Sequence, residues 1–224
     1  MMGLAGGGFA VLCNGAALEG PDGGVLRCAT RELACAVAEE WRQAGARTLT
    51  SLVGRSQRIE AAPDRTLAAL LGFARSDLLC HRAADPPRLA AMQATQWQPW
   101  LDWLRDRHGV ALPVTCGVMP LVLQATAFET LREVLQELPA RVLAGLDLAV
   151  PALGSLVLGL ALAERQIEAA QAVTLSRLEA IFQHAIWGED PVSSAHAAHL
   201  TEQIIQTDYF MRLTEPAFGS ADPC

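Results

Sequence analysis

The most apolar stretch of the chain, residues 148–163, limits what the chain can fold into. These 16 residues include no charged side chain, although they do include Pro151, Gly154 and Gly159. A helix that crosses a bilayer needs about 20 apolar residues, so we expect no membrane insertion. We predict a buried helix at the centre of a helical domain, with a break at Pro151 and the apolar helix over residues 152–164.

The composition is that of a globular protein, and it excludes several functions. The chain has 224 residues, 51% of them apolar, which suffices for one average domain or two small ones. Its net charge is −7 and no segment is rich in basic residues, so we expect no nucleic acid partner. All 17 basic residues are arginine. A chain without lysine cannot be a P-loop NTPase, a protein kinase or a pyridoxal enzyme.

The cysteine pattern points to free thiols. None of the six forms a Cys-x-x-Cys pair: Cys13, Cys28, Cys35, Cys80, Cys116 and Cys224. The chain is large and apolar enough to fold without disulfides, so we expect a cytoplasmic protein with reduced cysteines. The first residues lack the basic region and long apolar run of a secretory signal.

The first third of the chain alternates between strand and helix signals. A strand over residues 9–13, an Asn14-Gly15 turn, a second turn over 20–24 and a return strand over 25–28 predict β-hairpins. Further on, the patterns predict a helix over 31–44 capped by Thr30, a β-like piece over 48–53, a polar piece over 55–60 with no clear period, a helix over 64–75 capped by Asp64, and a short apolar piece capped by Ser76-Asp77.

The remainder of the chain is predicted to be helical. Asp85-Pro86-Pro87 is the best linker candidate, so we predict an N-terminal α+β domain over 1–84 and a helical domain over 85–224. The predicted helices cover 88–108, with a new start at Pro99 capped by Gln98; 126–138, with Thr126 and Glu129 as a capping box; 141–150; 152–164; 167–187; and 191–213, begun by Ser193-Ser194. Residues 110–120 form a predicted extended connector, and the fold class is α+β, a small β-containing domain followed by a larger all-helical orthogonal bundle.

The segment over residues 174–190 resembles a display site. An apolar helical face is formed by Leu175, Leu178, Ile181, Phe182, Ala185 and Ile186. Trp187 closes this face, Gly188 ends the helix, and the carboxylates Glu189 and Asp190 come directly after it. For Trp187, packing in the core and anchoring of a partner both remain open.

Signatures of catalysis and metal binding are weak. His196 and His199 are neighbours on one helix but have no third ligand nearby, so we expect no metal. Cys80 and His81 are adjacent, yet a nucleophile and its base must be brought together by the fold. We expect Glu179, Glu189 and Asp190 to be surface carboxylates, and the ladder of Trp97, Trp100 and Trp103 to belong to the core. We therefore predict neither catalytic residues nor a cofactor.

Five ordered motifs resemble the chaperone family that handles the alpha subunit during ATP synthase assembly, found in mitochondria and alphaproteobacteria. After the Asn14-Gly15 and 20–23 turns, the matching motifs are Ala38-Glu39-Glu40-Trp41; Ser76-Asp77-Leu78-Leu79-Cys80-His81-Arg82; Gln93 with Trp97-Gln98-Pro99 and Trp103; Gly154-Ser155-Leu156-Val157-Leu158; and Leu175-Ser176-Arg177-Leu178-Glu179 with Gln183 and Trp187-Gly188. They cover nearly the whole chain. The chain departs from the family after Leu49-Thr50-Ser51-Leu52, where residues 54–58 replace the usual pattern.

The resemblance implies a monomeric binding protein with no catalytic centre or cofactor. It would bind the free alpha subunit, cover the surface meant for beta, and release alpha on assembly. The contact point would be Trp187, Glu189, Asp190 and Glu179, while Trp41, Asp77, Trp97, Trp103, Gly154 and Gly188 would hold the fold. Two alternatives stay open: a small thiol hydrolase that uses Cys80, and a helical scaffold that dimerises through its tryptophan face.

Overall fold

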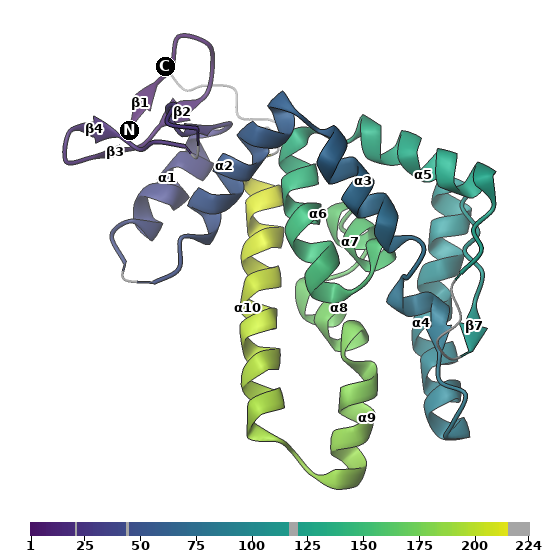
Figure 1. Ribbon diagram of the computed structural model, residues 1–224. Coiled ribbons are helices and arrows are strands. Elements are labelled where there is room, and N and C mark those ends of the chain that lie inside the picture. Colours follow the sequence, from purple (N-terminus) through teal and green to yellow (C-terminus); the bar gives the residue numbers. More distant parts are fainter. Residues whose placement is uncertain (21, 44, 117–120, 215–224) are drawn as a thin grey trace.

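The fold, seen in a computed structural model, is a helical assembly with a small β region at its N-terminal end (Figure 1). The structure describes residues 1–224 except 21, 44, 117–120 and 215–224. Pro21 of the predicted second turn, part of the predicted connector, and Cys224 therefore lie outside the described residues. The strands are β1 (Met2–Gly3), β2 (Phe9–Ala10), β3 (Leu12–Cys13), β4 (Ala16–Ala17), β5 (Arg27–Cys28), β6 (His81–Arg82) and β7 (Thr115–Cys116). The helices are α1 (Arg31–Glu40), α2 (Thr48–Ala61), α3 (Asp64–Phe73), the 3-10 turn η1 (Leu78–Cys80), α4 (Pro87–His108), α5 (Ala125–Glu137), α6 (Ala140–Leu153), α7 (Leu156–Ala163), α8 (Ala169–Ser176), α9 (Leu178–Trp187) and α10 (Pro191–Leu213).

The β region has two small antiparallel sheets and leads directly into α1. Strands pair in the order β1-β2-β5, and β3 pairs with β4 across the Asn14-Gly15 turn, which confirms the predicted hairpin. Both turn residues have positive φ, as this type of turn requires. Thr30 caps α1 by accepting the amide of Leu33. The Thr30 hydroxyl also donates to the carbonyl of Leu213, which ties the start of α1 to the end of α10.

Helix α6 lies at the centre of the helical part, between α10 on one side and α3 on the other (Figure 1). It packs against α2, α3, α7, α8 and α10. One cluster of buried apolar side chains runs from Val11 in the β region to Met211 in α10. The α+β fold class is confirmed, while the boundary between residues 84 and 85 stays a prediction. Packing across this position is extensive, and β6 pairs in parallel with β7 beyond it.

The predicted central helix is wrong in its continuity. Most of residues 148–163 are buried, although Pro151 is exposed, and they form the end of α6 and all of α7, separated by Gly154 and Ser155. Gly154 ends α6 with φ 68°, and Ser155 caps α7 by accepting the amide of Leu158. Pro151 does not break α6. A proline leaves the carbonyl four residues earlier without its helical donor, and here Arg55 donates to that carbonyl of Asp147 at 3.4 Å and forms an ion pair with its carboxylate.

Other predicted helix limits also need correction. Residues 48–60 belong to α2 and are neither strand nor loop, because Leu49, Leu52, Val53 and Ile59 are buried at helical spacing and the tertiary packing overrides local propensity. Helix α1 ends at Glu40, four residues before the predicted end, since the Glu40 carboxylate accepts the amides of Leu49 and Thr50 and turns the chain into α2.

Three predicted caps are misplaced. Asp64 is the first residue of α3 rather than its cap, because Pro63 holds the capping position. Helix α5 starts at Ala125, which puts Thr126 inside its first turn, where a capping conformation is not available. Helix α10 begins at Pro191 with Asp190 as its cap, ahead of the predicted Ser193-Ser194. A proline at the first helical position supports this earlier start.

Helix α4 runs unbroken through Pro99, so the predicted restart capped by Gln98 is wrong. An internal proline costs about 3 kcal/mol. Buried Trp97, Leu101 and Leu104 lie on both sides of it, and their packing offsets that cost. The predicted helix over 167–187 is in turn divided at Arg177, where α8 ends and α9 begins. The guanidinium of Arg177 donates to the Ser193 carbonyl and hydroxyl and so fastens this junction to α10.

Candidate interaction site at the α9–α10 tip

The end of α9, the following turn and the first residues of α10 form an exposed apolar and acidic surface, which we call the α9–α10 tip (residues 185–192). Every residue in it is exposed. Trp187 is 83% exposed and Val192 77%, and Ile186 is more than half exposed. A group of neighbouring exposed apolar side chains indicates a binding surface, whereas a single exposed apolar residue does not.

The tip is built by a backbone that only glycine adopts easily. Gly188 has φ 90° and ψ 168°, and a Cβ placed there would meet no atom within 4 Å. The constraint is therefore conformational and not one of space. It turns the chain sharply between α9 and α10, and Trp187, directly before this turn, is 83% exposed.

The two carboxylates of the turn have different partners. Asp190 accepts the amides of Val192 at 3.3 Å and Ser193 at 3.0 Å, so it caps α10. Within the described part of the chain, Glu189 accepts a single hydrogen bond, from the hydroxyl of Ser194 at 3.0 Å. Both remain exposed beside Trp187, so the tip combines apolar area with two negative charges. Such a combination fits a partner surface that is apolar and basic.

The predicted apolar face of this segment is only half buried. Leu175, Leu178 and Phe182 are buried, whereas Ile181, Ala185 and Ile186 are exposed. Glu179 lies in the first turn of α9, about 12 Å along the helix axis from Trp187. The structure thus brings Trp187, Glu189 and Asp190 together and leaves Glu179 apart. Sequence reasoning missed Val192 and the exposure of Ile186, whose apolar character alone suggested burial.

Four of the five sequence motifs meet inside the protein rather than at the tip. The buried carboxylate of Asp77 accepts the hydroxyl of Ser155 at 2.8 Å and the amides of Leu79 and Val157 at 3.0 Å each. Burial raises the pKa of Asp77, and these hydrogen bonds oppose that shift. The bonds hold η1 against the N-terminus of α7, and Leu78 adds an amide bond to the Gly154 carbonyl at 3.0 Å.

A second set of contacts links the segment over residues 76–82 to α4 and α8. Arg82 donates to the carbonyl of Gln93 and lies 5.2 Å from the ring centre of Trp97. The indole of Trp97 is 1% exposed and donates to the carbonyl of Leu175 at 3.0 Å. The segment over residues 76–82 takes part in both sets of contacts, so four of the motifs meet at this place. We call Asp77, Arg82, Trp97 and Ser155 the buried motif network.

Comparison with known proteins finds relatives in both sequence and structure. Residues 3–105 match the family described as ATP12 chaperone protein. The crystal structure of Atp12 from Paracoccus denitrificans is 32% identical to this chain, covers 93% of each chain, and superposes with a TM-score of 0.85. The chain belongs to the ATP12 chaperone family. An Asp-to-Lys mutant of the P. denitrificans protein matches equally well, and the Atu1473 protein of Agrobacterium tumefaciens, a candidate chaperone, is 27% identical over 93% of this chain and 81% of that one, with a TM-score of 0.85.

The remaining predicted structural residues of this ATP12 family member lie in the body of the protein. Trp41 is 39% exposed, donates to the Thr50 hydroxyl at 3.0 Å, and lies under Arg47 at 5.1 Å. Trp103 is half-buried, with its ring edge-on to His108 at 5.6 Å. Their predicted roles in holding the fold stay predictions.

The structure offers little support for Cys80 as the nucleophile of an enzyme. Its thiol is buried, and burial together with the Asp77 carboxylate raises its pKa well above the usual value, so the nucleophilic thiolate is disfavoured. The five cysteines in the described part of the chain are free thiols. Among the described residues, no three or more potential metal ligands lie together, so His196 and His199 belong to no such group. Within the same residues, none of the helices combines the length and apolar character of a membrane span.

Proposed function

We propose that this ATP12 family chaperone binds the free alpha subunit of the ATP synthase catalytic sector through the α9–α10 tip. It covers the surface of alpha that later meets beta, and it releases alpha on assembly. The chain acts as a cytoplasmic monomer, without catalysis or a cofactor. The observation that carries the proposal is the almost fully exposed indole of Trp187 beside Glu189 and Asp190.

The physical reason is complementarity between an unassembled subunit and this tip. A subunit that lacks its neighbour exposes an apolar interface, which aggregates unless it is covered. Exposed aromatic residues surrounded by charges are the side chains that most often carry binding energy at interfaces. Trp187, Ile186 and Val192 supply apolar area, and Glu189 and Asp190 supply a charged rim toward arginine or lysine of the partner.

The decisive experiment is co-expression of this protein with the alpha subunit from the same organism, followed by affinity capture and a light-scattering assay of alpha aggregation. We expect a stoichiometric complex and suppressed aggregation with the unaltered chain. Val192→Ala should weaken capture, whereas Val122→Ala, at a valine that is 87% exposed but far along the chain from the tip, should not. Equal capture by both variants would place the contact elsewhere, and no capture by the unaltered chain would refute the proposal.

A further inference from the structure

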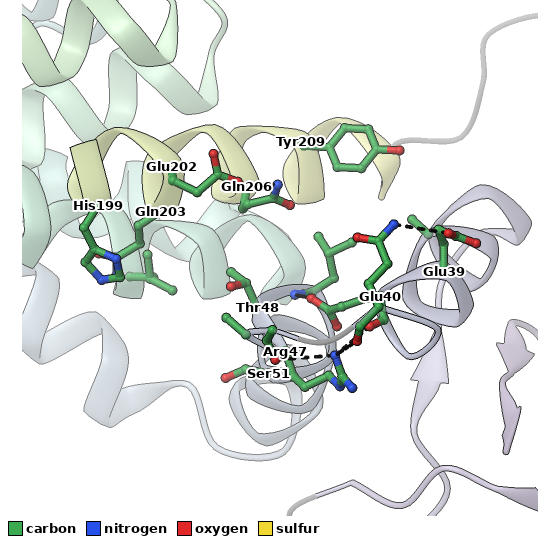
Figure 2. Close-up of a pocket in the computed structure, with 16 residues that line it drawn as sticks. Glu39, Glu40, Arg47, Thr48, Ser51, His199, Glu202, Gln203, Gln206 and Tyr209 are labelled. Carbon is green, nitrogen blue, oxygen red and sulfur yellow. Dashed lines mark hydrogen bonds between the residues drawn. The ribbon is translucent and has the colours of Figure 1, made fainter. Parts of the chain in front are cut away.

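A groove separates the α1–α2 connection from residues 199–209 of α10 (Figure 2). It has a volume of about 750 Å³, within the range of binding sites for small ligands and peptide segments. One wall is formed by residues between 36 and 51 and the other by one face of α10 from His199 to Tyr209, with Leu148 of α6 also in contact with the space. The groove lies outside residues 185–192 and shares no side chain with the α9–α10 tip.

The charge of this groove is negative. Three carboxylates line it, those of Glu39, Glu40 and Glu202, against the single guanidinium of Arg47. Arg47 is already committed to its own loop: it donates to the carbonyls of Glu40 at 2.6 Å and Gln43 at 2.9 Å, and it stacks over Trp41. Its charge is therefore directed at the backbone of one wall, and the open space faces acidic groups.

Glu202 is the carboxylate best placed to meet a ligand. Glu40 uses both of its oxygens on Leu49 and Thr50, and Glu39 is paired with Arg42 and Gln43. By contrast Glu202 has a single bond in the described part of the chain, to the side-chain amide of Gln206 at 2.9 Å. Figure 2 shows Glu202, Gln206 and Tyr209 in sequence along α10. A carboxylate, a carboxamide and an aromatic ring in one row suit the side chain of an arginine or lysine.

The length of the α10 wall indicates what kind of molecule fills the groove. From His199 to Tyr209 the helix rises by about 15 Å. An extended polypeptide covers that distance with about five residues. The half-buried Gln203 and Gln206 and the hydroxyl-bearing Thr48 and Ser51 line the same space, and their side chains can bind a peptide backbone.

We propose that this groove binds a short, extended, basic segment of the client polypeptide, with an arginine or lysine side chain held between Glu202 and Tyr209. The proposal rests on the proposed function for the identity of the client, and it adds a second contact that works through charge and backbone amides. A two-site chaperone holds its client more tightly than either site alone, because the second contact forms within the first complex.

The test uses two capped pentapeptides, Ala-Arg-Ala-Arg-Ala and Ala-Glu-Ala-Glu-Ala, titrated into the full ¹⁵N-labelled chain. We expect the arginine peptide to shift the amide signals of Arg47, Ser51, Gln203 and Gln206, and the glutamate peptide to leave them unchanged. Glu202→Gln should lower the affinity for the arginine peptide about two- to fivefold, as expected for an exposed charge pair. Glu137→Gln, an exposed carboxylate at the end of α5, should not.

Each outcome decides the question without reference to the client. Equal shifts with both peptides, shifts confined to other surfaces, or no shift at all would overturn the groove proposal. So would full binding by Glu202→Gln. Because the titration contains no alpha subunit, a failure of the proposed function leaves its result intact. Conversely, capture of alpha that depends on Val192 but not on Glu202 would retain the tip and reject the groove.

Discussion

The buried motif network and the α9–α10 tip both contain a tryptophan from the sequence motifs, and the two tryptophans lie in opposite environments. Trp97 is 1% exposed and its indole donates to Leu175, whereas Trp187 is 83% exposed and has no hydrogen-bond partner among the described residues. The difference lies in the position of each residue in its helix. Trp97 lies in the middle of α4, on the face that packs against the body of the protein, while Trp187 is the last residue of α9, directly before Gly188 and a turn into solvent.

This contrast separates the residues that maintain the fold from those available to a partner. Replacing a side chain of the network should change the free energy of unfolding, and it should change the affinity for a partner only because the fold is less stable. A side chain at the tip should do the reverse. Measuring both quantities for the same variants therefore tests the division.

The largest expected effect is that of Trp97→Ala. It removes a fully buried indole together with its hydrogen bond to the Leu175 carbonyl, so the free energy of unfolding should fall by about 3–5 kcal/mol. Urea denaturation followed by circular dichroism measures this. A loss below about 1 kcal/mol would mean that the network relaxes around the cavity and is not a rigid unit.

Asp77→Ala should come next. It removes the acceptor of three hydrogen bonds, two of which join η1 to the start of α7, and the buried donors of Ser155 and Val157 lose their partner. We expect a loss of about 2–4 kcal/mol in the same denaturation experiment. Asp77→Asn retains one acceptor oxygen and should lose less. If the two variants were equally stable, the hydrogen bonds to this carboxylate would not matter to the fold.

Trp187→Ala should leave the free energy of unfolding within about 0.5 kcal/mol and weaken the complex with alpha by about 2 kcal/mol, or roughly thirtyfold. Isothermal titration calorimetry gives the affinity. The matched variant is Trp41→Ala, at a tryptophan that is 39% exposed; it should lower stability through the loss of its bond to Thr50 and leave the intrinsic affinity unchanged. The opposite pattern would exchange the roles of the two residues.

The smallest effects should come from the carboxylates of the tip. Glu189→Gln should reduce affinity for alpha about two- to fivefold, and high salt should remove the difference. Asp190→Asn should do the same without loss of stability, because asparagine is an equally good helix cap. Asp190→Ala should in addition lower stability by about 1 kcal/mol. If Glu189→Gln and Asp190→Asn both bound alpha with unchanged affinity, only the apolar side chains of the tip would contribute to the contact.

How far the sequence predicts this protein differs between its local and its tertiary features. Where the signal is local and stereochemical, as at Asn14-Gly15, Thr30 and Gly188, the structure has the expected turn, cap or helix end. Expectations based on proline were wrong at Pro99 and Pro151, because the packing of α4 and the guanidinium of Arg55 compensate for the missing donor. Neither compensation is visible without knowing which distant segments meet.

The candidate site shows the same limit. The apolar spacing of residues 175–186 predicts a helix face but not where the protein body ends, so the exposure of Ile186 and Val192 could not be derived. The acidic groove is a second case. Its walls are contributed by segments about 150 residues apart, residues 36–51 and 199–209, and each segment alone resembles an ordinary solvent-facing helix surface.

The hydroxyl bond from Thr30 to Leu213 has a consequence for biosynthesis. Helix α10 covers parts of α1, α2, α6, α7 and α8, so these helices keep an uncovered apolar side while the ribosome is still adding residues 191–213. The nascent chain therefore cannot close its core in stages from the N-terminus. During its own translation, this member of a chaperone family therefore exposes apolar surface that can aggregate, as an unassembled subunit does. A messenger truncated before α10 should yield an insoluble product.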